Sequence, residues 1–295
     1  MSSVINTNIS SMSAQRNLSA TQNSLAVSMA RLSSGLRVNS AKDDAAGLSI
    51  AERMTSQVRG MNVAVRNSND GISMAQTAEG ALGKVGEIFQ RMRELAVQSS
   101  NATNSTSDKA SLDTEFGELA KEVQRVFAST TFNGRKIIST DAGAQIFQVG
   151  ANTAAENQIT VTTTNLTAQA DMTAVAGTDT TGAGRAVITG ASAAVLAVID
   201  KIDVAINKVS NERSILGASQ SRFESAISYL QISTENQASA RSRIMDANFA
   251  EETSNLSRSQ ILSQAGSAML AQANQMPQSV LSLLCLLYTS DAADE

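Results

Sequence analysis

The chain has 295 residues, a net charge of −4, a single Cys, and neither His nor Trp. Charges of both signs are spread along it, so it offers no basic footprint for nucleic acid, and no run of about 18 apolar residues could cross a membrane. One Cys excludes a disulfide framework, and an aromatic content of 3% argues against a compact globular core filled with large rings.

The first segment expected to be helical carries apolar residues at seven-residue intervals. They are Leu18, Leu25 and Leu32, interleaved with Met29 and Leu36. A repeat of 3.5 residues is typical of the contact line of a coiled coil. The N-terminus lacks the basic and apolar regions of a secretory signal peptide, so we expect a cytoplasmic chain, or one exported by a route that reads an uncleaved end.

Two further helices are predicted, from about Ala45 to about Ser99 and from Ser107 to Ala128. In both, apolar residues recur every three or four positions, which is the pattern of an amphipathic helix. Five glycines weaken the longer helix by about 1 kcal/mol each relative to Ala, and mark either the close approach of a neighbour or tolerance to bending. They are Gly60, Gly71, Gly80, Gly83 and Gly86.

A β region follows the third helix. Asn133-Gly134 lies between apolar residues and favours a tight hairpin turn. The apolar residues of 146–149 and 159–161, set among threonines, predict short strands. Residues 171–190 are rich in Gly, Thr and Ala and have little to bury, so we predict a short, variable, exposed segment there.

The strongest periodicity runs from about Ser192 to about Met245. One apolar row repeats every seven residues: Val195, Ile202, Val209, Leu216, Phe223 and Leu230. A helix of about 50 residues would be about 75 Å long, far beyond an ordinary globular helix, so this element is expected to be a rod.

A second heptad pattern occupies the C-terminal region. It consists of Leu262, Met269, Met276 and Leu283, interleaved with Ala273 and Val280. The two terminal patterns can pair only if the chain folds back on itself. We therefore predict a mainly α fold: a long antiparallel, coiled-coil-like helical bundle with a small β-hairpin patch and both termini at one end.

The terminal helices carry more apolar surface than one pair can bury. They form either an intramolecular coiled coil only or contacts between subunits as well, and surplus apolar surface favours the second. We expect both ends to be disordered in the monomer and to become ordered on packing, so limited proteolysis should trim them. The candidate contact residues are Ile5, Ile9, Leu18, Leu25, Leu32, Leu36, Leu262, Met269, Met276, Val280 and Leu283.

Catalytic and metal-binding patterns are missing from the sequence. There is no His to act as a base, the single Cys285 lies close to the C-terminus, and no paired carboxylates occur in a recognisable pocket context. Asp43-Asp44 and Asp70-Gly71 lack metal-ligand spacing. We therefore predict neither enzyme activity nor a cofactor or metal site.

Several stretches carry a more specific signal. They are Ile5–Asn8, Leu32–Arg37, Asn39–Leu48, Gln90–Gln98, Phe132–Gly134, Arg222–Ser225, Ala240–Ile244 and Ser257–Leu262. In this order they resemble the bacterial flagellins, the subunits of the flagellar filament, over about residues 1–134 and 195–284. The resemblance implies a secreted structural protein that self-assembles into an extracellular helical filament for swimming.

The resemblance also implies a domain organisation. Residues 1–42 and 249–295 would form a terminal coiled-coil domain that lines the filament core. Residues 43–170 and 191–248 would form a helical rod domain with β-hairpins, and 171–190 the short variable segment. Family members typically stop just after Leu284, so residues 285–295 are interpreted as a non-native tail.

The implied partners are other copies of the chain, a type III export chaperone, and the cap and hook–filament junction proteins. In immunostimulatory members, the positions of Arg91, Leu95 and Glu118 contact a vertebrate Toll-like receptor; by pattern alone these are ordinary helix residues. Some members carry O-linked sugars, which Thr160–Thr181 could accept.

Two alternatives stay open: a hook–filament junction protein, and a cytoplasmic coiled-coil signalling protein that forms discrete oligomers.

Overall fold

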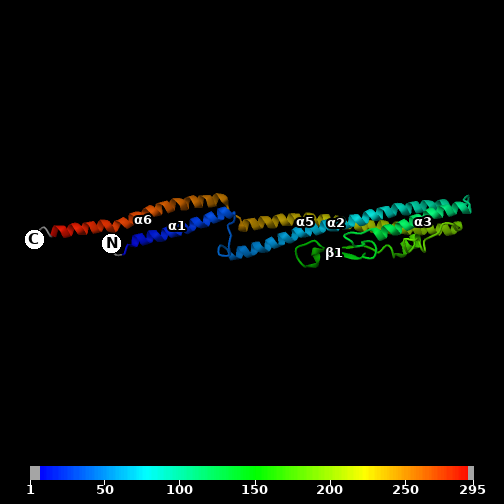
Figure 1. Cartoon of the computed structure of the whole chain (residues 1–295), viewed down its shortest axis with the longest axis horizontal. Coiled ribbons are helices and arrows are strands. Elements are labelled where there is room, and N and C mark those ends of the chain that lie inside the picture. The colour runs from blue at the N-terminus through cyan, green and yellow to red at the C-terminus, as the bar shows by residue number, and fades with distance from the viewer. Residues whose placement is uncertain (1–6, 292–295) are drawn as a thin grey trace. The chain divides into compact units, whose positions relative to one another are not determined.

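The computed structural model describes the backbone of residues 7–291 and the side chains of residues 7–276. The elements, labelled in Figure 1, are α1 (Ile9–Ser34), α2 (Ala45–Ser99), α3 (Thr106–Ser129), β1 (Ala144–Gln148), the 3-10 turn η1 (Ala155–Asn157), β2 (Gln158–Thr162), α4 (Ala170–Ala176), α5 (Ser192–Met245) and α6 (Phe249–Asp291). The predicted mainly α fold with long helices and a small β patch is confirmed.

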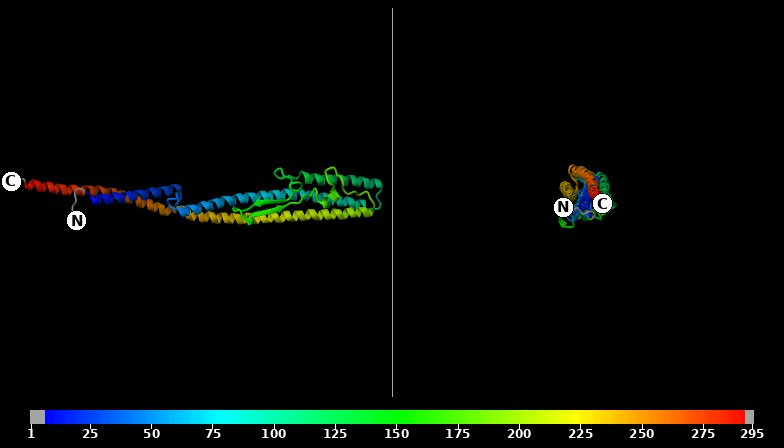
Figure 2. Two further views of the ribbon diagram at one scale, coloured as in Figure 1. Left: turned by 90° about the horizontal axis from the view of Figure 1, so that it is seen from below. Right: turned by 90° about the vertical axis from the view of Figure 1, so that its left-hand side faces the viewer.

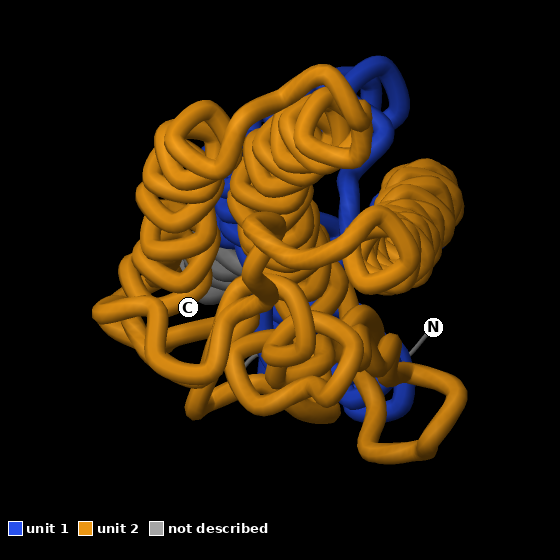
Figure 3. The backbone as a smooth tube through the Cα atoms, turned by 90° about the vertical axis from the view of Figure 1, so that its right-hand side faces the viewer, with its two compact units in different colours: residues 1–55, 237–295 blue, residues 56–236 orange. Residues whose placement is uncertain are grey.

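The chain divides into two compact units, coloured separately in Figure 3. Unit 1 comprises residues 1–55 and 237–295, and unit 2 comprises residues 56–236. The unit boundaries lie within α2 and α5, whereas the domain boundary expected from the sequence lies in the turns before α2 and after α5. The expected domain limits stay a prediction.

Unit 1 is built on α1 and α6, which lie side by side in opposite directions (Figure 1). Near the start of α1, the Asn8 side-chain amide donates to the Ala273 carbonyl at 2.7 Å. Near its end, the Arg31 guanidinium contacts the Glu252 carboxylate at 2.9 Å. Gly35, with φ of 70°, ends α1 in the left-handed conformation that glycine adopts without strain.

The interface between α1 and α6 consists largely of small residues on the α6 side. Leu18, Leu25 and Leu32 are half-buried, as expected for a contact row. On α6 the inward row contains Glu252, Ser259, Gly266 and Ala273 at seven-residue spacing. A Cβ atom added to Gly266 would lie 3.3 Å from Leu18 Cδ1, so the leucine packs directly over the glycine.

The predicted inward row of α6 is therefore wrong in phase. Leu262, Met269 and Met276 are exposed by 51%, 65% and 55%, and Met29 on α1 is exposed by 56%. Small residues let the two backbones approach closely, and this places Ser, Gly and Ala at the contact and leaves the larger apolar side chains outside. Ala273, by contrast, is buried as expected.

A tight turn joins α1 to α2 within unit 1. The Asp43 carboxylate accepts hydrogen bonds from the Ser40 N–H and hydroxyl and from the Asn39 N–H, which together lower the pKa of Asp43. Asp44 accepts from the Gly47 N–H at 2.8 Å and begins α2. This turn is formed by one of the stretches that carry the family resemblance.

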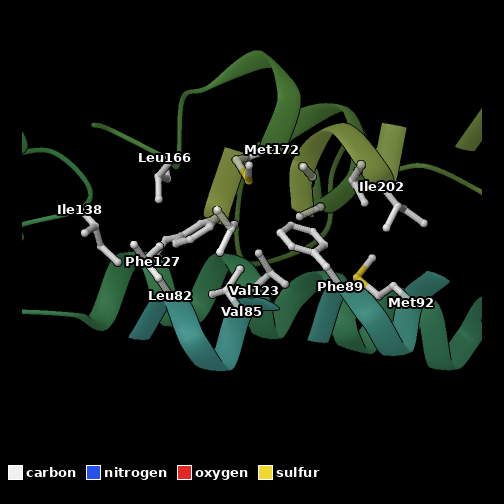
Figure 4. Close-up of a cluster of buried hydrophobic side chains, with 14 of the residues drawn as sticks. Leu82, Val85, Phe89, Met92, Val123, Phe127, Ile138, Leu166, Met172 and Ile202 are labelled. Carbon is white, nitrogen blue, oxygen red and sulfur yellow. The ribbon is translucent and has the colours of Figure 1, made fainter. Parts of the chain in front are cut away.

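In unit 2, α2, α3 and α5 run side by side, with the β-hairpin along them (Figure 2). Their shared core includes α4 and the segments around it (Figure 4). Its largest fully buried side chains are Phe89, Phe116, Phe127, Phe223, Leu82, Met92, Leu95, Ile138, Leu166, Met172, Ile188 and Ile202. The predicted heptad row of α5 is confirmed, because all six of its members are buried.

Two of the α2 glycines mark close approach. A Cβ atom on Gly71 would lie 2.6 Å from Phe223 Cζ, and one on Gly60 would lie 2.9 Å from Ala151 Cβ. Phe223 also meets Phe147 of β1 edge-on, with ring centroids 5.4 Å apart. No such neighbour lies within 4 Å of a Cβ atom at Gly80, so glycines on one helix have different reasons for being there.

The β region contains the predicted turn and strands. Asn133 and Gly134 have φ of 50° and 79°, and Phe132 and Arg135 exchange backbone hydrogen bonds of 2.9 and 3.0 Å. These are the features of a two-residue hairpin turn. β1 and β2 pair antiparallel in the register Ile146↔Thr160.

The segment at residues 171–190, predicted to be exposed, is only partly so: residues 178–181, 183–184 and 189–190 are exposed. The segment contains most of α4, and Met172, Val175 and Ile188 are buried in the core. Arg185 forms an ion pair of 2.6 Å with Asp113 of α3, and Asp113 also accepts from the Ile188 N–H. A few buried apolar residues and one ion pair with α3 are thus enough to pack parts of this Gly- and Thr-rich segment against the core of unit 2.

Candidate interaction surface

Unit 1 exposes a group of large apolar side chains, which we call its apolar surface. The α1 members are Ile9, Met12, Val27 and Met29, and the α6 members are Ile261, Leu262, Met269 and Met276. Their exposed fractions run from 44% for Val27 to 67% for Ile9. Leu262, Met269 and Met276 repeat every seven residues and so share one face of α6. An exposed helix face that carries a row of large apolar side chains is a candidate interaction site.

Two adjoining grooves follow the α1–α6 pair. One is lined by residues that include Ile9, Leu18 and Met269, and the other by residues that include Val27 and Arg31. Both grooves are also lined by Thr21 and Leu262, which makes them continuous. The result is an extended furrow with apolar side chains on its rims, a shape suited to an elongated partner such as a helix.

A polar contact lies at one end of this furrow. The Glu252 side chain is only 9% exposed and meets Arg31 at 2.9 Å. Among the described residues, Arg31 Nε and Glu252 Oε2 are buried and have no hydrogen-bond partner. A buried ion pair with unsatisfied atoms contributes little net stability, although removing one partner is costly. The pair therefore specifies how α1 and α6 align more than it strengthens them.

The predicted contact residues fall into three groups. Ile9, Leu262, Met269 and Met276 are exposed. Leu18, Leu25, Leu32 and Leu36 are half-buried within unit 1, and Leu36 also forms a backbone bridge with Asp246. Ile5, the side chains of Val280 and Leu283, and the side chains of the expected tail at 285–295 lie outside the described residues. The sequence interpretation missed Val27 and Ile261, whose only signal is an apolar side chain outside the inward rows.

A second candidate surface surrounds Arg91 in unit 2. The Arg91 guanidinium donates to Glu115 of α3 at 2.8 and 3.0 Å and to Glu94 at 3.0 Å, and these bonds raise its pKa. Glu118 lies one turn further along α3 and pairs with Lys121 at 2.8 Å. The structure thus supplies Glu115 as the acidic neighbour of Arg91, and the sequence interpretation missed it.

Leu95 is not part of this surface. It is 1% exposed and belongs to the core between the helices of unit 2. The expectation that Leu95 contacts a receptor directly is therefore wrong, because its side chain points into the fold while Arg91, four residues earlier, remains half-exposed.

In the part of the chain that the structure describes, no three His, Cys, Asp or Glu side chains gather as metal ligands would. Among the described helices, none combines the length and apolar character needed to cross a bilayer.

Comparison with known proteins gives consistent matches along the chain. The model for the bacterial flagellin N-terminal helical region matches residues 5–142, and that for the C-terminal helical region matches residues 199–284. The flagellin of Halalkalibacterium halodurans is 47% identical over 281 residues, and that of Bacillus subtilis is 41% identical over 305 residues; each alignment covers 95% of this chain and 99% of the relative. The crystal structure of Bacillus cereus flagellin aligns with 28% identity and a TM-score of 0.46, covering 56% of this chain and 88% of that one.

Proposed function

The chain belongs to the bacterial flagellin family, and we propose that it polymerises through the apolar surface of unit 1. Flagellins are structural proteins and not enzymes, and they build the extracellular flagellar filament. The chain is therefore a structural subunit of that filament. Family membership excludes the signalling alternative, and relatives named flagellin over 95% of the chain favour a filament subunit over a junction protein.

One observation supports the choice of surface: the large apolar side chains of α6 flank the contact with its partner helix and stay exposed. Leu262 and Met269 are more than half exposed, although neighbouring small residues are buried against α1. Covering one such side chain contributes about 1.5–3 kcal/mol to association. If a different surface of the next subunit covers it, and the rotation between subunits does not close a ring, the contact gives an open helical polymer.

Seeded polymerisation tests this proposal. Leu262→Ser and Met269→Ser should each raise the critical concentration for elongation by about tenfold or more, because a buried apolar side chain is lost from the interface. Val187→Ser changes an equally exposed apolar residue of unit 2 and serves as the control. Elongation of all three variants at the unmodified critical concentration would refute the proposal.

The tail at residues 285–295 can be tested in the same assay. We expect a chain ending at Leu284 to elongate into filaments of uniform width. If the tail is foreign, the full chain should fail or elongate poorly under the same conditions. Equal elongation of both forms would contradict its interpretation as a non-native segment.

The remaining partners are inferred from family membership. We expect filament rotation to drive swimming, with export of the unfolded chain through the flagellar type III system. The expected partners are an export chaperone, the distal cap and hook–filament junction proteins. The terminal domain at 1–42 and 249–295 would line the filament core, and the rod domain at 43–170 and 191–248 would carry load along it.

Recognition by a vertebrate Toll-like receptor is proposed for the α2–α3 face that carries Arg91, with Glu118 nearby. The half-exposed Arg91 side chain is suited to act as an anchor in a protein interface. In receptor reporter cells, Arg91→Ala should reduce potency by at least about tenfold. Arg125→Ala, which removes another exposed arginine paired with an acid on α3, is the matched control. Equal potency of the two variants would refute this site.

A further inference from the structure

We propose that the exposed methionines of unit 1 are a modification site: oxidation to the sulfoxide in the free chain blocks assembly, and reduction restores it. The inference rests on the proposed role of the apolar surface of unit 1. Its residues are Met12, Met29 and Met269, and the modifying agent is a two-electron oxidant such as hydrogen peroxide.

Two groups of described methionines differ sharply in exposure, while Met54 and Met245 are half-buried. In unit 1, Met12, Met29 and Met269 are exposed by 57%, 56% and 65%. In unit 2, by contrast, the core methionines are exposed by 5% or less: Met61, Met74, Met92 and Met172. Because the rate of thioether oxidation depends on access to the sulfur, the first group should react in the folded chain and the second only when unit 2 opens.

The chemistry needs no residue beyond the methionine itself. A sulfur lone pair attacks one peroxide oxygen, so that an S–O bond forms as the O–O bond breaks. The departing hydroxide takes the proton from the oxygen now bound to sulfur, which leaves the sulfoxide and water. The sulfur loses two electrons and the peroxide gains them. The product is a polar sulfoxide in place of a flexible apolar thioether, and it exists as two epimers that are reduced by two different sulfoxide reductases.

The position of Met269 explains why the change should matter. Met269 lines the furrow together with Ile9 and Leu262, in the middle of the exposed heptad row of α6. A sulfoxide there must be desolvated when the next subunit covers it, and contact with apolar side chains does not compensate for the free-energy cost of that desolvation. We expect the critical concentration to rise by about tenfold or more on oxidation. Assembly should in turn protect these sulfurs, so that free chains react and assembled chains resist.

The experiment compares free chains and preformed polymer treated with hydrogen peroxide. Mass spectrometry of peptides measures the sulfoxide at each methionine, and seeded elongation is measured before and after treatment. We expect Met12, Met29 and Met269 to be oxidised early in free chains and more slowly in polymer. The oxidised free chains should lose seeded elongation and recover it after incubation with both classes of sulfoxide reductase.

A matched variant separates this effect from general damage. Replacing Met12, Met29, Met269 and the likewise exposed Met276 by Leu keeps an apolar side chain of similar volume, so the variant should elongate untreated and continue to elongate after peroxide. A variant as sensitive as the unmodified chain would overturn the inference, as would unchanged elongation of fully oxidised chains. Failure of both the untreated full chain and the untreated chain ending at Leu284 to elongate would instead refute the proposed function, and this inference with it.

Discussion

Two glycine-to-alanine substitutions on α2 should change the stability of unit 2 in opposite directions. At Gly71 a Cβ atom would lie 2.6, 2.9 and 3.0 Å from three ring atoms of Phe223, and the first two distances are shorter than real Cβ contacts. Phe223 is fully buried and is held edge-on by Phe147, so its ring cannot move aside freely. At Gly80 a Cβ atom would meet nothing within 4 Å.

The magnitudes follow from two opposing contributions. Replacing a helical glycine by Ala stabilises by about 1 kcal/mol because the unfolded chain loses conformational freedom. Overpacking a filled core costs about 1–3 kcal/mol. Gly80→Ala should therefore stabilise unit 2 by about 1 kcal/mol, whereas the clash at Gly71 should outweigh that gain and destabilise Gly71→Ala by up to about 2 kcal/mol.

Urea unfolding of unassembled chains, followed by circular dichroism at 222 nm, measures the change in stability of both variants. When the same chains are unfolded by heat instead, the thermal midpoint should move by roughly 2–4 °C for each kcal/mol. Adding Phe223→Leu to Gly71→Ala should remove the clash, so the two changes together should cost at least about 1 kcal/mol less than the sum of the separate costs. If Gly71→Ala stabilises as much as Gly80→Ala, the close contact with Phe223 does not constrain α2 and the reasoning fails.

Three further predictions concern polar contacts. Burial raises the pKa of Asp113, but hydrogen bonds from Arg185 and a backbone N–H outweigh it, so the pKa lies below its usual value. The Asp113–Arg185 pair should therefore stabilise the folded chain fully above about pH 4, and this stabilisation should be lost as pH falls through the folded pKa of Asp113. The urea midpoint of Asp113→Asn should consequently depend less on acid pH than that of the unmodified chain. Arg31→Leu should leave Glu252 buried without its partner and weaken the α1–α6 pair by about 2–3 kcal/mol, seen as faster amide exchange in α1. Ser105→Ala should remove the α3 cap and cost about 1 kcal/mol in urea unfolding.

Each of these predictions has an outcome that would contradict it. An Asp113→Asn variant with the same acid sensitivity as the unmodified chain would show that the ion pair does not govern that range. Adding Glu252→Leu to Arg31→Leu should restore slow exchange, and equally fast exchange in the double variant would point to lost packing and not to an unpaired carboxylate. Unchanged stability of Ser105→Ala would mean that solvent replaces the cap.

Much of unit 2 could be predicted from the sequence because its local signals agree with its packing. The α5 heptad row has large apolar residues at each position, and these are the side chains that fill the core. Asn133-Gly134 specifies its turn through backbone preferences alone, with both residues at positive φ. In these places periodicity or turn chemistry decides the structure without help from distant residues.

The interface of unit 1 could not be predicted in the same way. Its inward row on α6 contains Ser259 and Gly266, which a search for large apolar residues passes over, and the more visible Leu262 row faces outward. Whether α6 turns one row or the other towards α1 depends on how closely two backbones can approach. That is a property of the pair and not of either helix.

The contacts of Arg91 and the burial within the 171–190 segment could not be predicted from the sequence, for related reasons. Which glutamate of α3 meets Arg91 depends on the register between two antiparallel helices, which neither sequence encodes alone. The 171–190 segment is held by Asp113, which is far away in the chain, so composition within the segment could not reveal its burial.

The small-residue interface between α1 and α6 has a calorimetric consequence. Ser28, Ser259 and Gly266 offer little apolar area, so mainly the half-buried leucines of α1 become exposed to water when the two helices separate. The heat-capacity increase on melting free chains should then come mainly from unit 2. Polymerisation should show the opposite sign, a negative heat-capacity change, because it covers the apolar side chains that the helix pair leaves in contact with water.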